Sequence, residues 1–412
     1  MLMSEYKIPL IDLQEQSVRL GDELLSRVKN VIMSAQYIMG NEVKTFEESF
    51  AKFIGTKHAI SCGNGTDALV LALEALGVGN GDEVITTTYT FFATAESIAY
   101  VGAKPVFIDV NPETFNMDAA LIEKAITSKT KAIMPVHLFG QACKMDEIMA
   151  IASKHNLYVI EDACQAVGGS YKGQMLGTFG DVACFSFFPT KNLGAAGDGG
   201  MIVTSNDRIA TTLKALRVHG SGENGKAALT YRNESSLDAL NCDTPDGLNL
   251  DNTVYNASKY YNYIVGHNSR LDELQAAVLN VKLNYLNEWN ERRSVLAQNY
   301  SDQLSSLQTK GQFKVPYTST DVKHVYHMYI LKAENKEALT NYLASKGIAT
   351  GIYYPVPLHL QKAFENLGYK VGDFPVAEYL SKRTFAIPMY AELTDEQQAY
   401  IISTINNYAN TI

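Results

Sequence analysis

The sequence predicts an α/β protein whose larger part is a mostly parallel β-sheet covered by helices on both faces. Between residues 58 and 217, short apolar runs typical of strands alternate with helical patterns. This alternation implies right-handed crossovers that lay successive strands side by side and parallel. Polar side chains follow directly after several of the runs, as expected where ligands gather beyond the carboxyl ends of parallel strands.

The apolar runs and the helical patterns between them place the elements of this sheet. Strands are predicted at residues 58–61, 83–87, 105–109, 132–136, 157–161, 182–187 and 200–204. Helices are predicted near residues 66–77, 92–103, 118–126, 144–155 and 207–217, after two N-terminal helices that run to about Ala35 and near 42–54.

The C-terminal third is expected to form a smaller α+β domain. From Leu271, apolar residues recur at helical spacing and predict one long helix leading from the large domain (1–270) into the second domain (271–412). Further strands are predicted near 313–316, 326–332 and 348–353, and further helices at 336–346, 374–383 and 394–410.

Two stretches near the end of the large domain carry weaker signals. Residues 220–226 (GSGENGK) match the dinucleotide-binding pattern GxGxxG, but they follow a helix rather than a strand, so we expect a surface turn. Residues 221–263 are rich in Asn, Asp, Ser and Tyr with little periodicity. They are expected to form an inserted loop that either covers the active site or lies on the surface.

Composition excludes several classes of function. The net charge is −9 and no Lys/Arg-rich run is present, which argues against nucleic-acid binding. The N-terminus lacks a signal-peptide pattern and no apolar run approaches a membrane span, so we expect a cytoplasmic protein without membrane contact. The five cysteines are scattered without CxxC spacing. His324 and His327 lie in a predicted strand, where no nearby Cys or Asp completes a metal site, so no metal site is expected.

Three segments together could hold pyridoxal phosphate (PLP). AISCGNGTDAL (59–69) predicts a strand, a glycine turn and a helix capped by Thr66, which suits a phosphate. VIEDACQ (159–165) brings Asp162 to the end of a strand, where it can pair with the ring nitrogen, and FSFFPTKNLGAAGDGG (185–200) supplies Lys191 for the aldehyde. In isolation, Asp162 could equally cap a turn, and Lys191 could be a surface lysine.

With VGHNSRLDELQAA (265–277), these segments resemble the DegT/DnrJ/StrS family of nucleotide-sugar aminotransferases, from about Pro9 to the C-terminus. The resemblance implies the aspartate-aminotransferase-like fold (PLP fold type I), with PLP alternating with pyridoxamine phosphate. Lys191 and Asp162 would be catalytic. The cofactor-binding residues would be Gly65, Thr66, Phe91, Asp162, Gln165, Ser186, Lys191 and Asn268.

Within this set the roles differ. Ser186 and the backbone at Gly65 and Thr66 would hold the phosphate, Phe91 would stack on the ring, and Gln165 would hydrogen-bond its phenolic oxygen. Asn268 would reach the phosphate of the neighbouring subunit, which makes a homodimer the expected unit.

The sugar pocket is less defined. Its candidates are His219, Tyr354 and His359, each equally compatible with a structural role.

The resemblance also suggests a reaction. GIYYPVPLHLQ (351–361) and GDFPVAE (372–378) most resemble transaminases that move an amino group from L-glutamate to the C3 keto group of a TDP-linked 3-keto-6-deoxyhexose. The product would be an amino-deoxysugar for an O-antigen in lipopolysaccharide, another surface glycan or an antibiotic. Alternatives are a C4 aminotransferase, a PLP sugar dehydratase (whose relatives carry histidine in place of Lys191) or a non-catalytic regulator.

Overall fold

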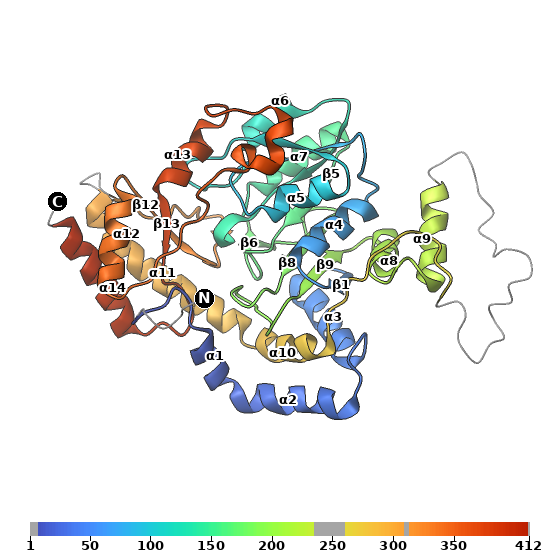
Figure 1. Ribbon diagram of the computed structural model, residues 1–412, viewed down its shortest axis with the longest axis horizontal. Helices are drawn as coiled ribbons and strands as arrows, with labels where there is room; N and C mark the ends of the chain where they lie inside the picture. The colour runs from blue at the N-terminus through green and yellow to red at the C-terminus, as the bar shows by residue number, and fades with distance from the viewer. Residues whose placement is uncertain (1–6, 235–259, 309–312, 411–412) are drawn as a thin grey trace, which may run out of the picture.

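The computed structural model describes residues 7–234, 260–308 and 313–410, arranged as a large α/β part and a smaller C-terminal α+β part (Figure 1). The main sheet has seven strands in the order β1-β9-β8-β5-β4-β2-β3. They are β1 (His58–Cys62), β2 (Glu83–Thr87), β3 (Lys104–Ile108), β4 (Thr130–Met134), β5 (Tyr158–Asp162), β8 (Val182–Ser186) and β9 (Gly200–Thr204).

The sheet is mostly parallel, as predicted. Strands β3, β2, β4, β5 and β8 run parallel, whereas β9 runs antiparallel to both β8 and β1. Asp162 pairs with Cys184 near the end of β8, and Ser186 and Cys62 both lie opposite Gly200. The carboxyl ends of β5, β8 and β1 therefore meet at one edge of the sheet.

Helices surround this sheet and build the smaller part. They are α1 (Leu13–Arg19), α2 (Gly21–Ser34), α3 (Asn41–Ile54), α4 (Gly65–Ala75), α5 (Ala93–Tyr100), α6 (Ile122–Ala125), α7 (Met145–His155), α8 (Asp207–Leu216), α9 (Gly222–Glu234), α10 (Glu273–Leu283), α11 (Leu286–Gln308), α12 (Lys336–Ser345), α13 (Pro375–Arg383) and α14 (Asp395–Ala409).

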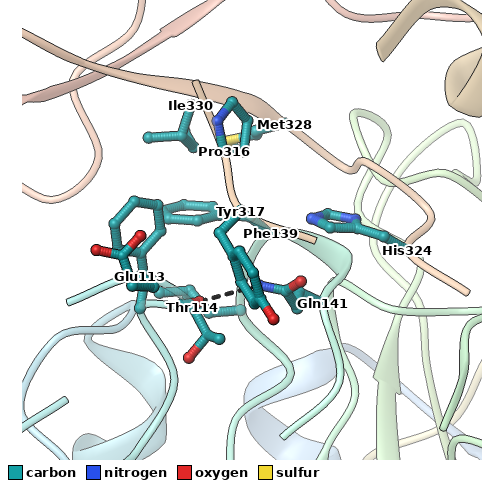
Figure 2. A pocket seen from close by; sticks show the side chains of 11 residues that line it. Glu113, Thr114, Phe139, Gln141, Pro316, Tyr317, His324, Met328 and Ile330 are labelled. Atoms are coloured by element: carbon teal, nitrogen blue, oxygen red, sulfur yellow. Dashed lines mark hydrogen bonds between the residues drawn. The ribbon is translucent and has the colours of Figure 1, made fainter. Parts of the chain in front are cut away.

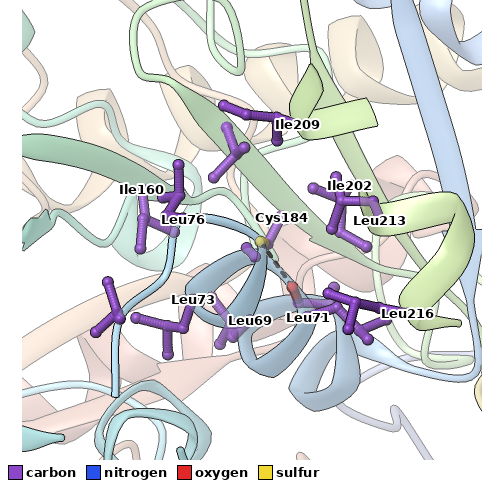
Figure 3. Packing of buried hydrophobic residues seen from close by; sticks show 14 of the residues in the cluster. Leu69, Leu71, Leu73, Leu76, Ile160, Cys184, Ile202, Ile209, Leu213 and Leu216 are labelled. Atoms are coloured by element: carbon purple, nitrogen blue, oxygen red, sulfur yellow. Dashed lines mark hydrogen bonds between the residues drawn. The ribbon is translucent and has the colours of Figure 1, made fainter. Parts of the chain in front are cut away.

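Alternation along β8 shows that both faces of the sheet are covered, because successive side chains of a strand point to opposite faces. Val182 and Cys184 join a core with α4 and α8, whereas Ala183 and Phe185 join one with α3 and α10. Figure 3 shows the first core, in which leucines of α4 pack between the sheet and α8. Each fully buried leucine or isoleucine contributes about 1.5–3 kcal/mol.

The smaller part has its own core. Its strands are β10 (Phe313–Lys314), β12 (Tyr329–Ala333) and β13 (Thr384–Ile387). Tyr300 of α11, Tyr329 of β12 and Ile401 of α14 are buried together, and Ile8 near the N-terminus joins them. A third sheet of short strands, β6 (Ser170–Tyr171), β7 (Gln174–Met175) and β11 (Val322–Lys323), connects the two parts.

Three predicted features of this fold are wrong. The helix predicted from Leu271 breaks between α10 and α11, where the Tyr285 amide donates three residues back to the Lys282 carbonyl (3.0 Å). Residues 348–353 form no strand and make only single bridges, to Ile8 and Ala386. The expected turn and loop after residue 220 give way to helix α9, while residues 235–259 lie outside the described part of the chain.

Candidate active site

The edge of the sheet where β1, β8 and β5 end holds an anion cradle. Helix α4 begins at Gly65, and its cap is Asn64 rather than the predicted Thr66, because Asn64 Oδ1 accepts the Asp67 amide (2.8 Å). The first-turn amides of Gly65 and Thr66 have no intrahelical acceptor and suit an anion. A Cβ added at Gly65 would lie 2.7 Å from the Ser186 Cβ, so the helix start and Ser186 form one close-fitting surface.

Asp162 is held as a buried carboxylate at the end of β5. Thr94 Oγ1 at the start of α5 donates to Asp162 Oδ2 (2.8 Å), and the Cys164 amide donates to Oδ1 (3.3 Å). Only 5% of the residue is exposed. Both donors are neutral groups, so the carboxylate is available to pair with the protonated nitrogen of a ring.

Lys191 lies in the loop between β8 and β9, where its amide donates to the Phe188 carbonyl (2.8 Å). The residue as a whole is half-buried, but its amine is deep enough that desolvation lowers its pKa. The nearby Cys164 and Asp162 act in the opposite direction, and desolvation dominates. A lowered pKa raises the fraction of neutral amine, which is the form that attacks an aldehyde.

Gln165 connects this group to an aromatic wall. Its Oε1 accepts the Phe139 amide (2.8 Å), so its Nε2 must donate to the Tyr354 hydroxyl (3.0 Å). Burial raises the pKa of Tyr354, so its O–H remains protonated and can donate onward. Tyr354 stacks on Phe139 (6.3 Å between centroids) and lies 6.2 Å from Phe91, whose side chain is 56% exposed.

The structure therefore brings Gln165, Tyr354 and Phe91 into one group. Through Tyr354, this group reaches the predicted sugar pocket.

Other predicted residues lie elsewhere. His219 is exposed, and its amide donates to the His267 carbonyl (2.9 Å) beside Asn268, which is also exposed and bonds Arg270. His359 is buried with both ring nitrogens engaged, by Thr88 Oγ1 (2.7 Å) and Glu378 Oε1 (3.2 Å). These surroundings favour a structural role for His359, and its assignment to the sugar pocket stays a prediction.

Sequence reasoning missed two residues that hold the site. One is Thr94, the donor to Asp162. The other is Ser269, which accepts the Gly63 amide (2.9 Å) and donates to Asp67 Oδ2 (2.5 Å), so that it ties residues 266–270 to the cradle. Only their positions in the sequence could have indicated these roles. Thr94 lies at the start of a predicted helix that follows a predicted strand, and Ser269 is the middle residue of the NSR triplet.

Phe139 also borders a narrow pocket between the two parts of the protein (Figure 2). Glu113, Gln141 and His324 contribute its polar groups, and Gln141 Nε2 donates to the Thr114 carbonyl (3.5 Å). None of the predicted cofactor residues lines this pocket, although it shares Phe139 with the aromatic wall of the candidate active site.

Two other kinds of feature are absent from the described residues. No helix there is long and apolar enough to cross a bilayer. No group of three or more His, Cys, Asp or Glu side chains there could bind a metal ion.

Comparison with known proteins identifies the family. Residues 18–406 match the model of the DegT/DnrJ/EryC1/StrS aminotransferase family. A "pleiotropic regulatory protein" of Geobacillus stearothermophilus is 45% identical over 97% of this chain and 98% of its own length. A UDP-N-acetyl-3-dehydro-α-D-glucosamine 3-aminotransferase of Acidithiobacillus ferrooxidans is 41% identical over 97% of both chains.

A further relative and a solved structure are similar over nearly the whole chain. A dTDP-3-amino-3,6-dideoxy-α-D-galactopyranose transaminase of Aneurinibacillus thermoaerophilus is 38% identical over 97% of this chain and 99% of its own. The crystal structure of DesV from Streptomyces venezuelae superposes with a TM-score of 0.87 and 34% identity, covering 98% of this chain and 99% of DesV. The cradle at Gly65, the Asp162 carboxylate and the Lys191 amine fit PLP. The chain belongs to the DegT/DnrJ/EryC1/StrS aminotransferase family, and PLP is its cofactor.

Proposed function

We propose that the protein transfers the amino group of L-glutamate to the C3 keto group of a TDP-linked 3-keto-6-deoxyhexose, to make an amino-deoxysugar for a glycan or an antibiotic. The observation that carries the aminotransferase step is the conjunction of Lys191, Asp162 and Gln165 at one edge of the sheet. Amination at C3 is supported by relatives that are named as transaminases acting at C3 of a sugar. A TDP-linked substrate is supported by the name of the relative from Aneurinibacillus thermoaerophilus.

Each residue has a distinct part in this proposal. The amides of Gly65 and Thr66 and the Ser186 hydroxyl hold the phosphate, and Asp162 keeps the ring nitrogen protonated. When bound, PLP withdraws electrons from the carbon that loses its proton. Lys191 would hold the cofactor through its aldehyde, and its amine would carry the proton at Nζ during the amino transfer.

The aromatic wall is proposed to receive the sugar. Phe91 would stack on the cofactor ring. The Tyr354 oxygen already accepts from Gln165, so its hydroxyl hydrogen is free to donate to the substrate. His219 remains a candidate for the sugar or nucleotide from its exposed position next to Asn268.

A homodimer with composite sites belongs to the same proposal. Ser269 fixes the segment of Asn268 against the cradle of its own subunit, while Asn268 itself faces outward and Val265 is 91% exposed. An exposed apolar residue beside an outward amide suits contact with a second subunit, where Asn268 would reach the phosphate.

A UDP-linked 3-keto sugar is the second candidate, because the Acidithiobacillus relative is named for one and is 41% identical. Incubation with glutamate and a panel of TDP- and UDP-linked 3-keto and 4-keto sugars tests both, with the aminated carbon read by NMR. Amination at C4 alone would refute the C3 assignment. No amination of any sugar by PLP-loaded protein would instead favour a regulator, the role for which the Geobacillus relative is named.

A further inference from the structure

Asn192, the residue after Lys191, is only 4% exposed and has its amide group fully engaged. Its Nδ2 donates to Asn290 Oδ1 of α11 (2.8 Å) and to the Val325 carbonyl (2.9 Å). Its Oδ1 lies 3.2 Å from His327 Nδ1. Because both Nδ2 hydrogens point at oxygens, Oδ1 must be the acceptor, and His327 Nδ1 is the donor.

Asn290 extends these contacts to a second loop of the site. It is 1% exposed, and its Nδ2 donates to the Val167 carbonyl (3.0 Å), two residues beyond Gln165. The fit is close, because a Cβ added at Gly168 would lie 2.6 Å from Asn290 Nδ2. One side chain therefore joins the loop of Lys191 to the loop of Gln165.

His327 brings in the smaller part of the protein. It is 2% exposed and lies two residues before β12, and desolvation lowers its pKa, so the ring is neutral and keeps a single N–H for Asn192. The far end of the lysine loop is held from α10, where Lys282 Nζ donates to the Gly194 carbonyl (2.9 Å) and Gln275 Oε1 accepts the Ala196 amide (2.8 Å).

We infer that Asn290 is a positioning residue that, through Asn192 and His327, fixes Lys191 relative to Gln165 and ties Lys191 to the smaller domain. The inference rests on the proposed role of Lys191. The physical reason is that a buried amide whose oxygen and nitrogen are both hydrogen-bonded has one favourable orientation, whereas its loss leaves the buried Asn192 donor and Val167 acceptor unpaired.

The chain offers a matched control for this inference. Asn280 of α10 is also a buried asparagine (7% exposed), but its Nδ2 donates to Glu42, at the carbonyl (3.0 Å) and at Oε2 (2.7 Å), away from the lysine loop. Asn290→Ala and Asn280→Ala each remove buried amide hydrogen bonds. Only the first removes those of the Lys191 loop.

Two readouts separate positioning from general loss of stability. In Asn290→Ala, the peptide 189–197 of the cofactor-free protein should exchange its amide hydrogens about tenfold faster than in Asn280→Ala at equal distance from the melting temperature. In the holoenzyme, kcat should fall about 10- to 100-fold with KM for glutamate nearly unchanged, since an angstrom of misplacement costs rate rather than binding. Equal exchange and equal kcat in the two variants would overturn the inference.

A second pair of variants applies if Asn290→Ala does not fold. In His327→Asn, an amide nitrogen can replace the Nδ1 donor and should keep most of kcat, whereas His327→Leu should lose it. Equal kcat in this pair would contradict the inference.

Borohydride reduction of the wild-type holoenzyme with peptide mapping tests the role of Lys191 separately. A label at Lys191 together with unaffected Asn290 variants would overturn only the positioning role.

Discussion

Gly65→Ala tests the phosphate cradle through a clash whose size the structure gives. The added Cβ would lie 2.7 Å from the Ser186 Cβ and 3.1 Å from its Oγ, whereas carbon atoms prefer about 3.5–4.0 Å. Both Cβ positions are set by the backbone, so no side-chain rotation relieves the contact. The start of α4 or the end of β8 must move by about 1 Å.

That movement separates the two halves of the cradle. The loss of one hydrogen bond to a charged group costs about 1.5–3 kcal/mol, so the dissociation constant for PLP should rise about 10- to 100-fold. Titration of the cofactor-free variant with PLP, followed by the visible absorbance of the complex, measures the constant directly. Thermal unfolding of the cofactor-free form reports any loss of stability, which the higher helix propensity of alanine partly offsets.

Gly21→Ala is the matched control. Gly21 also opens a helix, α2, and a Cβ added there meets no heavy atom within 4 Å. Its PLP affinity should equal that of the wild type. If Gly65→Ala binds PLP within about twofold of this control, the argument that Gly65 is required for the cradle is refuted.

Three further predictions address other parts of the site. Lys191→Ala should abolish turnover and leave no cofactor attached after borohydride reduction, and residual transamination above background would contradict the proton-carrier role. Ser269→Ala should weaken PLP binding and lower the free energy of unfolding by about 1–3 kcal/mol, because the Gly63 amide and the Asp67 carboxylate lose a partner; chemical denaturation showing no change would be contrary evidence. Burial lowers the pKa of Lys282 from 10.5 to about 8, so the unfolded chain binds more protons there between about pH 8 and 10.5. As the pH rises through that window, the unfolding free energy of the wild type should therefore increase by up to about 3 kcal/mol relative to that of Lys282→Met. If chemical denaturation gives the same pH dependence for both proteins, the lowered pKa of Lys282 is refuted.

Elements that are specified by a local pattern of residues could be predicted from the sequence. Strands such as β5 and β8 are continuous apolar runs because both their faces are buried, and Asp162 and Lys191 were recognised because they directly follow such runs. The resemblance to a known family, carried by these motifs, predicted a fold that the family match confirms.

The errors among the strands of the smaller part arose where pairing with distant residues decides the structure. Strand β13, which the sequence did not predict, has four residues directly after α13 and is specified by its register with β12, for example Leu331 opposite Phe385. Residues 348–353 have strand-like composition, but Ile348 finds only Ile8 as a partner. Propensity for β-structure depends on such context, so no local pattern separates the two cases.

The same distinction applies within the site. Side chains proposed to touch the cofactor within one subunit come from the ends of β1, β2, β5 and β8 and the residues that follow them. The groups that orient the loops of Lys191 and Gln165 come from α10, α11 and the segment before β12. Asn290 and His327 read in sequence as ordinary helix and strand-flanking residues, because their hydrogen bonds reach 98 and 135 positions along the chain to Asn192. An amide buried at 1% exposure is costly unless each of its hydrogen bonds is made. Its presence next to the lysine loop is therefore better explained by orientation of that loop than by stability alone, since an apolar residue would fill the same volume without that cost.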